Sequence, residues 1–315
     1  MTADRPCLEP GTLWPRLVRQ TERALARGVL RPLQTRTETL PDAGMPFQVR
    51  VAANLARKAA ARRRPDPGTG HGEGRPDPFL PWEPELFVAD VTPRHVCLLN
   101  KFNVLDHHLL VVTRQFVDQE RLLELDDFEA LWRCLAEFDA LGFYNGGATA
   151  GASERHRHLQ LVPLPLGGSD GALPLSALLG RAPGGATLST VPGLAFRHVF
   201  APLDSPRPLD PAARARTTFA LYRAMLQAAG IAVAEPGPAP RQGSPYNLLV
   251  TRDWMLLVPR REEHAEGISI NALAYAGSLF VRDAAQLERV RRAGPMTLLE
   301  QVAEPLAERG REARR

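Results

Sequence analysis

The sequence has little that would anchor the protein in a membrane. No run of about 18 apolar residues occurs, and the first residues lack the basic-then-apolar order of a signal peptide. The 315 residues are 44% hydrophobic and 23% charged, which is enough apolar content for a substantial core. These features predict a soluble cytoplasmic protein, with one large globular domain or two smaller ones.

Cysteine is also scarce. The three cysteines, Cys7, Cys97 and Cys134, are odd in number, far apart in the chain and without a CxxC pair. This pattern argues against a disulfide framework and against a cysteine-based zinc site. We therefore expect the cysteines to be small buried hydrophobic residues, and we expect no metal site.

Lysine is nearly absent, because Lys58 and Lys101 are the only lysines among 39 basic residues. The net charge of +4 is a weak field for a chain of this length and does not by itself indicate a polyanionic partner. The run Arg62–Arg64 could contact phosphates, but aromatic residues make up only 6% of the chain and do not interleave with it. A non-catalytic nucleic-acid-binding protein is therefore the weakest reading, and the two retained lysines are candidates for a specific role.

The N-terminal half alternates between helical and extended patterns. Residues 62–78 are dense in Pro, Gly and charge, and we predict a flexible loop there. Apolar spacings of three and four predict helices, and short runs rich in Val and Leu predict strands. The predicted helices are 11–28, 47–60 and 126–141, and the predicted strands are 86–91, 95–100, 109–113, 143–145 and 155–162.

The C-terminal half has a similar composition after a Gly/Pro-rich connection over 163–193. We predict a strand near 195–200 and a helix over 210–229. The strands 246–251 and 254–259 are separated by only two residues, which predicts a tight antiparallel hairpin. The mixture of strand pairs and helices indicates an α+β fold.

One motif carries chemistry. Residues 155–162 read Arg-His-Arg-His-Leu-Gln-Leu-Val, and the period of two on a strand places His156, His158 and Gln160 on one face. They follow the glycine-rich turn 146–153, whose backbone N–H groups can hold phosphate oxygens. An imidazole beside such a turn can attack phosphorus and form a phosphoramidate intermediate. By spacing alone, an exposed polar strand face or half of a metal site would fit as well.

The His-x-His-x-Gln pattern resembles the transferase branch of the histidine-triad (HIT) superfamily. Further segments resemble the diadenosine tetraphosphate (Ap4A) phosphorylases, also called ATP adenylyltransferases, and they follow in the right order over roughly residues 45–305. The segments are 77–81, 85–88, 99–102, 108–113, 143–145 and 151–153 in the first half, and 246–251, 258–260 and 268–277 in the second.

The resemblance implies a fold and a division of the chain. It implies a HIT-like α+β fold with a mainly antiparallel sheet flanked by helices. Residues 1–165 would form the N-terminal half with the motif, residues 190–305 the C-terminal half that completes the nucleotide site, and 306–315 a frayed tail.

The resemblance also implies a reaction, the reversible phosphorolysis of Ap4A by inorganic phosphate to ATP and ADP through an adenylyl-histidine. His158 would be the nucleophile, His156 would orient the site, and Gln160 would donate its amide to the phosphate. A neutral Gln cannot deprotonate water, which favours transfer to phosphate over hydrolysis. No tightly bound cofactor is implied, a magnesium ion accompanying the nucleotide stays open, and so does the oligomeric state.

The remaining residues carried over from the resemblance would bind the substrate. They are Lys58, Asn100, Lys101, Asn145, Gly151, Ala152, Ser153, Glu154, Asn271, Ala272, Leu273, Ser278 and Arg282. Three of them depart from the family, because Glu154 stands where Gln is usual, and Ser278 and Arg282 replace an expected Met and Lys. His107 and His108 lead into a strand and are expected to be structural. A related enzyme of the hexose-1-phosphate uridylyltransferase type is the alternative, although the Cys/His zinc site common there is not found in this sequence.

Overall fold

The computed structural model describes residues 8–52, 77–166, 173–180, 187–204, 209–235 and 240–306. Cys7, Lys58, the run Arg62–Arg64 and most of the predicted loop and tail lie outside these ranges. Within them, no helix combines the length and apolar character needed to cross a membrane.

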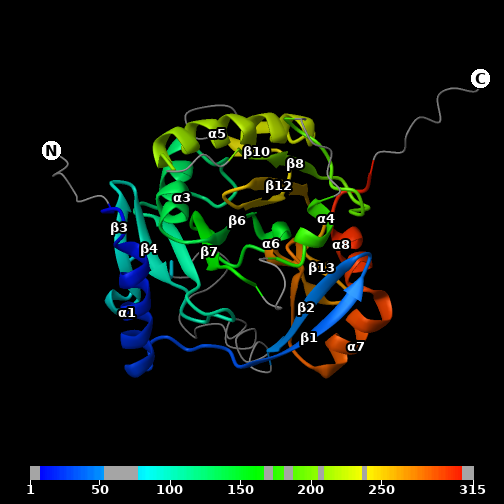
Figure 1. The fold of residues 1–315 in the computed structure, drawn as a ribbon, viewed down its shortest axis with the longest axis horizontal. Helices are drawn as coiled ribbons and strands as arrows, with labels where there is room; N and C mark the ends of the chain where they lie inside the picture. The colour runs from blue at the N-terminus through cyan, green and yellow to red at the C-terminus, as the bar shows by residue number, and fades with distance from the viewer. Residues whose placement is uncertain are drawn as a thin grey trace, which may run out of the picture.

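An eight-stranded sheet forms the centre of the molecule, and strands from both halves of the chain contribute to it (Figure 1). Neighbouring strands pair antiparallel throughout. In spatial order the strands are β3 (Phe87–Thr92), β4 (His95–Leu99), β5 (Leu109–Thr113), β7 (His158–Pro163), β6 (Ala140–Gly146), β11 (Tyr246–Val250), β12 (Trp254–Pro259) and β8 (Val199–Pro202). The mainly antiparallel α+β fold is thereby confirmed, while the division into 1–165 and 190–305 stays a prediction.

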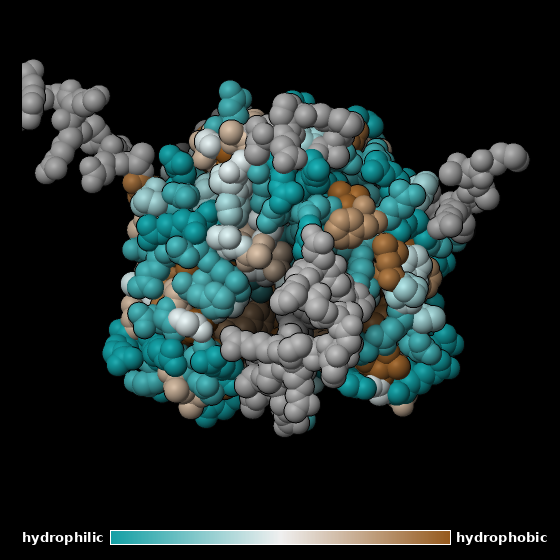
Figure 2. All heavy atoms as spheres, turned by 180° about the vertical axis from the view of Figure 1, so that it is seen from behind, coloured by the Kyte–Doolittle hydropathy of each residue, from teal (hydrophilic) through white to brown (hydrophobic). Residues whose placement is uncertain are grey.

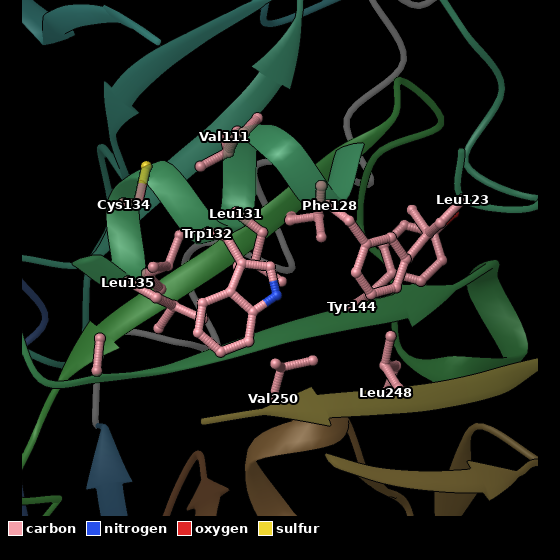
Figure 3. Packing of buried hydrophobic residues seen from close by; sticks show 14 of the residues in the cluster. Val111, Leu123, Phe128, Leu131, Trp132, Cys134, Leu135, Tyr144, Leu248 and Val250 are labelled. Carbon is pink, nitrogen blue, oxygen red and sulfur yellow. The ribbon is translucent and has the colours of Figure 1, made fainter. Parts of the chain in front are cut away.

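Three helices cover one face of this sheet: α1 (Leu13–Ala26), α3 (Leu125–Glu137) and α5 (Pro211–Ala228) (Figure 1). Figure 3 shows Trp132 of α3 above β6 and β11, with Val250 below it and Tyr144 to its side. The Trp132 indole nitrogen donates to Thr218 Oγ1 of α5 at 2.7 Å, so the largest core side chain buries its one polar atom with a partner. Cys97 and Cys134 are buried in this core as expected, with their sulfur atoms 3.7 Å apart.

Two separate apolar clusters cover the opposite face. One lies over β4 and β5, where Phe79 packs on Val96, Leu98, Leu110 and Val112. The other lies over β6, β11 and β12 and includes the C-terminal elements. The side chains of His158 and Gln160 in β7 lie on the strip of sheet between the two clusters. The register places them there, because Leu110 pairs with Gln160 and Val112 pairs with His158.

A second, three-stranded sheet packs with three helices of the C-terminal half. β1 (Thr35–Asp42) pairs antiparallel with β2 (Met45–Ala52), and β2 pairs in parallel with β15 (Ser278–Val281). In Figure 1 this sheet lies beside α7. The accompanying helices are α6 (Ala272–Tyr275), α7 (Ala284–Ala293) and α8 (Pro295–Val302).

The remaining elements are short. They are the 3-10 turns η1 (Pro84–Leu86) and η2 (Ala148–Ala150), helix α4 (Ser176–Leu179), and the strands β9 (Val233–Glu235), β10 (Arg241–Gln242), β13 (His264–Ala265) and β14 (Ile268–Ser269). The surface seen from behind is mainly hydrophilic (Figure 2), and Leu25, Phe116 and Leu306 are the large hydrophobic side chains found exposed among the described residues.

The helix predicted over 47–60 is wrong where the structure describes it. Residues 45–52 form strand β2, because Phe47, Val49 and Val51 alternate with Gln48 and Arg50 at a period of two. The helix predicted over 126–141 ends at Glu137, since β6 already begins at Ala140. Most other predicted strands, the first helix, the helix over 210–229 and the hairpin are confirmed within a few residues, whereas the strand expected near 195–200 begins at Val199.

A buried ion pair joins Arg157, the residue directly before β7, to α3 on the helix-covered face. Arg157, which alternates with the motif histidines, is 1% exposed and donates to Asp127 Oδ2 at 2.9 Å. His95 Nε2 lies 3.0 Å from the other carboxylate oxygen, and Asp127 also accepts from the backbone of Glu124 at the start of α3. Burial raises the pKa of Asp127, but the His95 hydrogen bond and the Arg157 charge outweigh it and hold that pKa below its ordinary value.

We expect Asp127→Ala to destabilise the fold by about 3–5 kcal/mol, because it leaves the buried Arg157 guanidinium with only the more distant Glu124 carboxylate, at 3.6 Å. Asp126→Ala is the matched control on the same helix turn. Asp126 pairs with Arg94, but both side chains are about half exposed (42% and 55%), so its loss should cost less than about 1 kcal/mol. Urea unfolding of both variants measures the difference, and equal midpoints would show that the buried pair contributes nothing.

Candidate active site

A cavity of about 420 Å³ lies between the two halves, against the strip of β6 and β7 described above. Residues of both halves line it, as the resemblance implied. The candidate residues that the structure brings together in its wall are Asn100, Asn145, Gly151, Ser153, Gln160, Asn271, Leu273 and Arg282.

His158 has the geometry of a neutral nucleophile. Its Nδ1 lies 2.7 Å from the backbone carbonyl of His156, an acceptor, so Nδ1 carries the hydrogen and Nε2 carries the lone pair. Among the described residues Nε2 has no hydrogen-bond partner. Burial lowers the pKa of His158 to about 4 and outweighs the hydrogen bond to the His156 carbonyl, which raises that pKa. The ring is therefore uncharged at neutral pH.

His156 has no nitrogen available for attack. Its Nδ1 lies 2.7 Å from Asp77 Oδ2, and its Nε2 lies 2.8 Å from the carbonyl of Thr113. The ring is 1% exposed, and Phe79 packs on both motif histidines, with ring centroids 5.7 Å from His156 and 5.3 Å from His158. This agrees with an orienting role for His156. Asp77 and Phe79 had no expected role, although both lie in the segment 77–81 that carries the resemblance.

Gln160 is held by a relay of two side chains. Its Oε1 lies 2.9 Å from His108 Nε2, and His108 Nδ1 lies 3.3 Å from the amide nitrogen of Asn100. The assignment that satisfies both contacts has Asn100 donating to His108 and His108 donating to Gln160. The Gln160 oxygen is then engaged, which leaves its NH₂ group as the donor for a ligand. His108 was expected to be structural and is found in the cavity wall, whereas His107 packs against Trp14 at 5.3 Å between ring centroids.

Asn145 joins the two walls of the cavity. Its Oδ1 accepts from Asn247 Nδ2 at 2.8 Å and from the backbone of Ala272 at 3.0 Å. Gly151 lies against the same loop, because a Cβ there would come within 2.7 Å of the Ile270 carbonyl, and its φ of +86° is in the left-handed region. The glycine-rich turn and residues 270–272 are thus in direct contact.

A buried arginine supports this contact from behind. Arg260 is 1% exposed, and its Nη1 donates to Asn247 Oδ1 at 2.6 Å and to the Ile270 carbonyl at 3.0 Å. The same nitrogen lies 3.4 Å from the carbonyl of Ala150. Arg260 therefore bonds to residues of both walls. In the sequence, the only indication of a role for Arg260 was that it lies in the segment 258–260, which carries the resemblance.

Some candidate residues do not line the cavity, including His156 and His158, which are both buried. Lys101 Nζ bonds to Glu83 Oε1 at 2.6 Å. Ser278 is fully buried and lies 3.3 Å from Arg50 Nε. Ala152 and Glu154 flank the wall residue Ser153 in the turn, and Ala272 touches the site through its backbone bond to Asn145. Over the described ranges, His, Cys, Asp and Glu side chains do not gather in groups of three or more that could hold a metal ion.

Comparison with known proteins places the chain in a family. Residues 3–181 match the Ap4A phosphorylase N-terminal domain, and residues 192–305 match the ATP adenylyltransferase C-terminal domain. The chain belongs to the Ap4A phosphorylase family. Members of this family are nucleotidyltransferases, and the chain is an enzyme of that class.

Two proteins of the yeast Saccharomyces cerevisiae are similar to this family member over most of their length. Diadenosine 5',5'''-P1,P4-tetraphosphate phosphorylase 2 is 27% identical over 79% of this chain and 80% of its own. Protein APA1 is 26% identical over 82% of this chain and 84% of its own.

Solved structures of yeast Ap4A phosphorylase Apa2 share the fold. The complex with AMP has a TM-score of 0.74 at 24% identity and covers 96% of this chain and 100% of that chain. The complex with Ap4A has a TM-score of 0.73 at 23% identity and covers 95% of this chain and 99% of that chain.

The lowered pKa of His158 predicts the pH dependence of the enzyme. The neutral ring is the reactive form, so activity is fully present well above pH 4 and is lost as the pH falls through the folded pKa of about 4. We expect kcat/KM to show no loss attributable to this group between about pH 5.5 and 8. An acidic limb centred near the ordinary histidine value of about 6.5 would contradict this assignment.

The relay to Gln160 predicts unequal effects for adjacent histidines. His108→Ala should lower kcat by about 10-fold or more, because the Gln160 amide is released and can turn its oxygen toward the phosphate. His107→Ala is the control, since His107 contacts Trp14 and Thr21 rather than the cavity wall. It should alter thermal stability and leave kcat within about twofold. Steady-state kinetics and melting curves on both variants test the difference, and equal kcat losses would rule out the relay.

Proposed function

We propose that the enzyme phosphorolyses Ap4A to ATP and ADP through an adenylyl group on His158. The observation that carries the proposal is the buried, neutral imidazole whose Nδ1–H is bound to a carbonyl and whose Nε2 keeps its lone pair, with no partner among the described residues. A nitrogen lone pair prepared in this way suits attack on phosphorus. The relatives named for this activity, and the Apa2 complexes with AMP and Ap4A, support the choice of substrate.

The first step forms the bond between His158 Nε2 and an α-phosphorus of Ap4A and breaks the bond from that phosphorus to the bridging oxygen, which leaves with ATP. Because ATP is already a stable anion, it needs no general acid. As the new bond forms, positive charge develops on the imidazole, and the His156 carbonyl that accepts from Nδ1–H stabilises it. In the second step an oxygen of inorganic phosphate attacks the same phosphorus, releases ADP and restores neutral His158.

Gln160 selects between phosphate and water as the acceptor in this mechanism. Its amide, held through His108, donates to a non-bridging oxygen of the transferred phosphate. An amide cannot remove a proton from water, so the adenylyl group waits for a better nucleophile. Phosphate supplies that nucleophile as an anion.

The chemistry of the wall residues assigns binding positions to the rest of the substrate. Asn145, Gly151 and Ser153 would hold the phosphate chain, and Arg282 lines the same cavity. Lys101 would have to leave Glu83, or share it, to reach the phosphates. We also propose that the enzyme binds phosphate, ATP and ADP, that a magnesium ion accompanies the nucleotide, and that the protein is cytoplasmic.

The test is a single incubation of purified protein with Ap4A, with and without phosphate. Without phosphate we expect about one ATP per active site, followed by a stall as an acid-labile adenylyl enzyme. Added phosphate should release ADP. His158→Ala should give neither product while it keeps its fold by circular dichroism.

Gln160→His provides the internal comparison in that experiment. An imidazole with a pKa near neutrality can assist water, so this variant should release AMP even without phosphate. AMP as the main product of the wild-type enzyme in phosphate buffer would show that it is a hydrolase and would refute the proposed reaction.

A further inference from the structure

The strand that carries the nucleophile separates from its neighbour at the nucleophile itself. β6 and β7 pair from Ala140↔Pro163 to Phe143↔Gln160, and then the ladder stops. Continued at the same register, it would place Asn145 opposite His158. These are a wall residue of the cavity and the reactive histidine, so the point of separation lies inside the active site.

One side-chain amide fills the gap. Gln119 Oε1 accepts from the backbone N–H of His158 at 2.8 Å. Its Nε2 donates to the carbonyl of Asn145 at 2.9 Å and to the carbonyl of His158 at 3.2 Å. Both amide hydrogens and the oxygen of Gln119 are therefore engaged, and the two strands are bridged through the amide where they no longer bond to each other.

Gln119 is itself fixed in place. It is 1% exposed, its backbone N–H donates to the Arg155 carbonyl at 2.7 Å, and its carbonyl accepts from the hydroxyl of Tyr144. The preceding residues run along the motif strand as well, because Arg157 N–H donates to the Val117 carbonyl at 2.7 Å and Asp118 bridges to His156. The segment 117–119 therefore runs antiparallel beside 155–158 around an isolated β-bridge, and Gln119 stands at its inner end.

We propose that Gln119 is a positioning residue for nucleotidyl transfer, which holds β6 and β7 apart so that His158 Nε2 and the Asn145 wall are spaced for the phosphate between them. Gln119 is not among the residues that line the cavity. It acts through the backbone of His158, and an error of about 1 Å in the placement of a reacting group can cost about 100-fold in rate. The inference rests on the proposed reaction, because it assigns Gln119 to the adenylylation of His158.

Gln119→Met tests the proposal, because it keeps the length of the side chain and removes all three hydrogen bonds. We expect the single-turnover rate constant for ATP release from Ap4A to fall by about 10- to 100-fold, with KM within about threefold and an unchanged pH profile. Gln48→Met is the matched control. Gln48 is also a buried glutamine (7% exposed), its side chain bonds to Thr39, and it is absent from the cavity wall. Its rate constant should equal that of the wild type.

The two readouts separate positioning from stability. A purely structural role would lower the melting temperature and the burst amplitude, while the folded fraction would react at the wild-type rate constant, and that result would overturn the proposal.

If Gln119→Met does not fold, Gln119→Glu takes its place. It keeps the acceptor for His158 N–H and sets a carboxylate oxygen against two carbonyls, so it should also slow adenylylation, and a wild-type rate constant in this variant would overturn the proposal equally. A wild-type enzyme that releases no ATP would refute the proposed function and the positioning role with it, whereas an active wild type with an equally active Gln119→Met refutes the positioning role alone.

Discussion

The antiparallel pairing of β6 with β11 is the interaction on which the rest of the structure depends. It runs from Tyr246↔Gly146 to Val250↔Gly142 and joins the two halves of the chain in one sheet. The register sets Asn145 directly opposite Asn247, so that the Asn247 amide can reach Asn145 Oδ1. From this pair the contacts continue to Ala272 and Arg260, and the cavity has walls from both halves because the sheet has strands from both halves.

The alternation of side chains along β7 separates the chemistry from the charge. His158 and Gln160 lie on the sheet face opposite the helices, where Gln160 lines the cavity, while Arg157 between the two histidines pairs with Asp127 on the helix-covered face. The ion pair therefore fastens the strand to α3 without placing a full charge beside the nucleophile on its own face. Burial can then keep the His158 ring neutral, because the main cause of its low pKa is the loss of water around it.

The sequence was sufficient where the signal is local and periodic. The period of two over 156–160 placed the motif on one face, the short Val/Leu runs gave β3, β4 and β5, and the two-residue gap gave the β11–β12 hairpin. The prediction was wrong at 47–60. Val49 and Val51 alternate there, but so short a pattern is compatible with either a strand or a helix. The bounds of the elements near the site were also off by a few residues.

The supporting contacts of the site could not be predicted, because they join residues that are distant in the chain. Asp77 meets His156 across 79 residues, and Gln119 meets His158 across 39. A lone Gln or Asp in a loop has no pattern that marks it. His108 is the instructive case, since its neighbour His107 has the same side chain and a structural role. Only the strand pairing Leu110↔Gln160 brings His108, rather than His107, to the motif.

The wall of the cavity contains few formal charges in the part that the structure describes. The formal charges of Arg282 and Glu263 offset each other, and the other polar groups of the wall include the amides of Asn100, Asn145 and Gln160 and the residues Gly151 and Ser153 of the glycine-rich turn. Both the substrates and the products of the proposed reaction are polyanions, and for such a reaction a wall with few charges has a physical advantage. A dense cluster of cations would stabilise the dinucleotide, the transition state and the nucleotide products to similar extents, and uniform binding of that kind does not raise kcat. Fixed neutral donors gain most where charge changes, which is at the phosphorus that His158 attacks. The backbone and side-chain contacts that set the positions of these amides therefore matter as much to the reaction as the amides themselves.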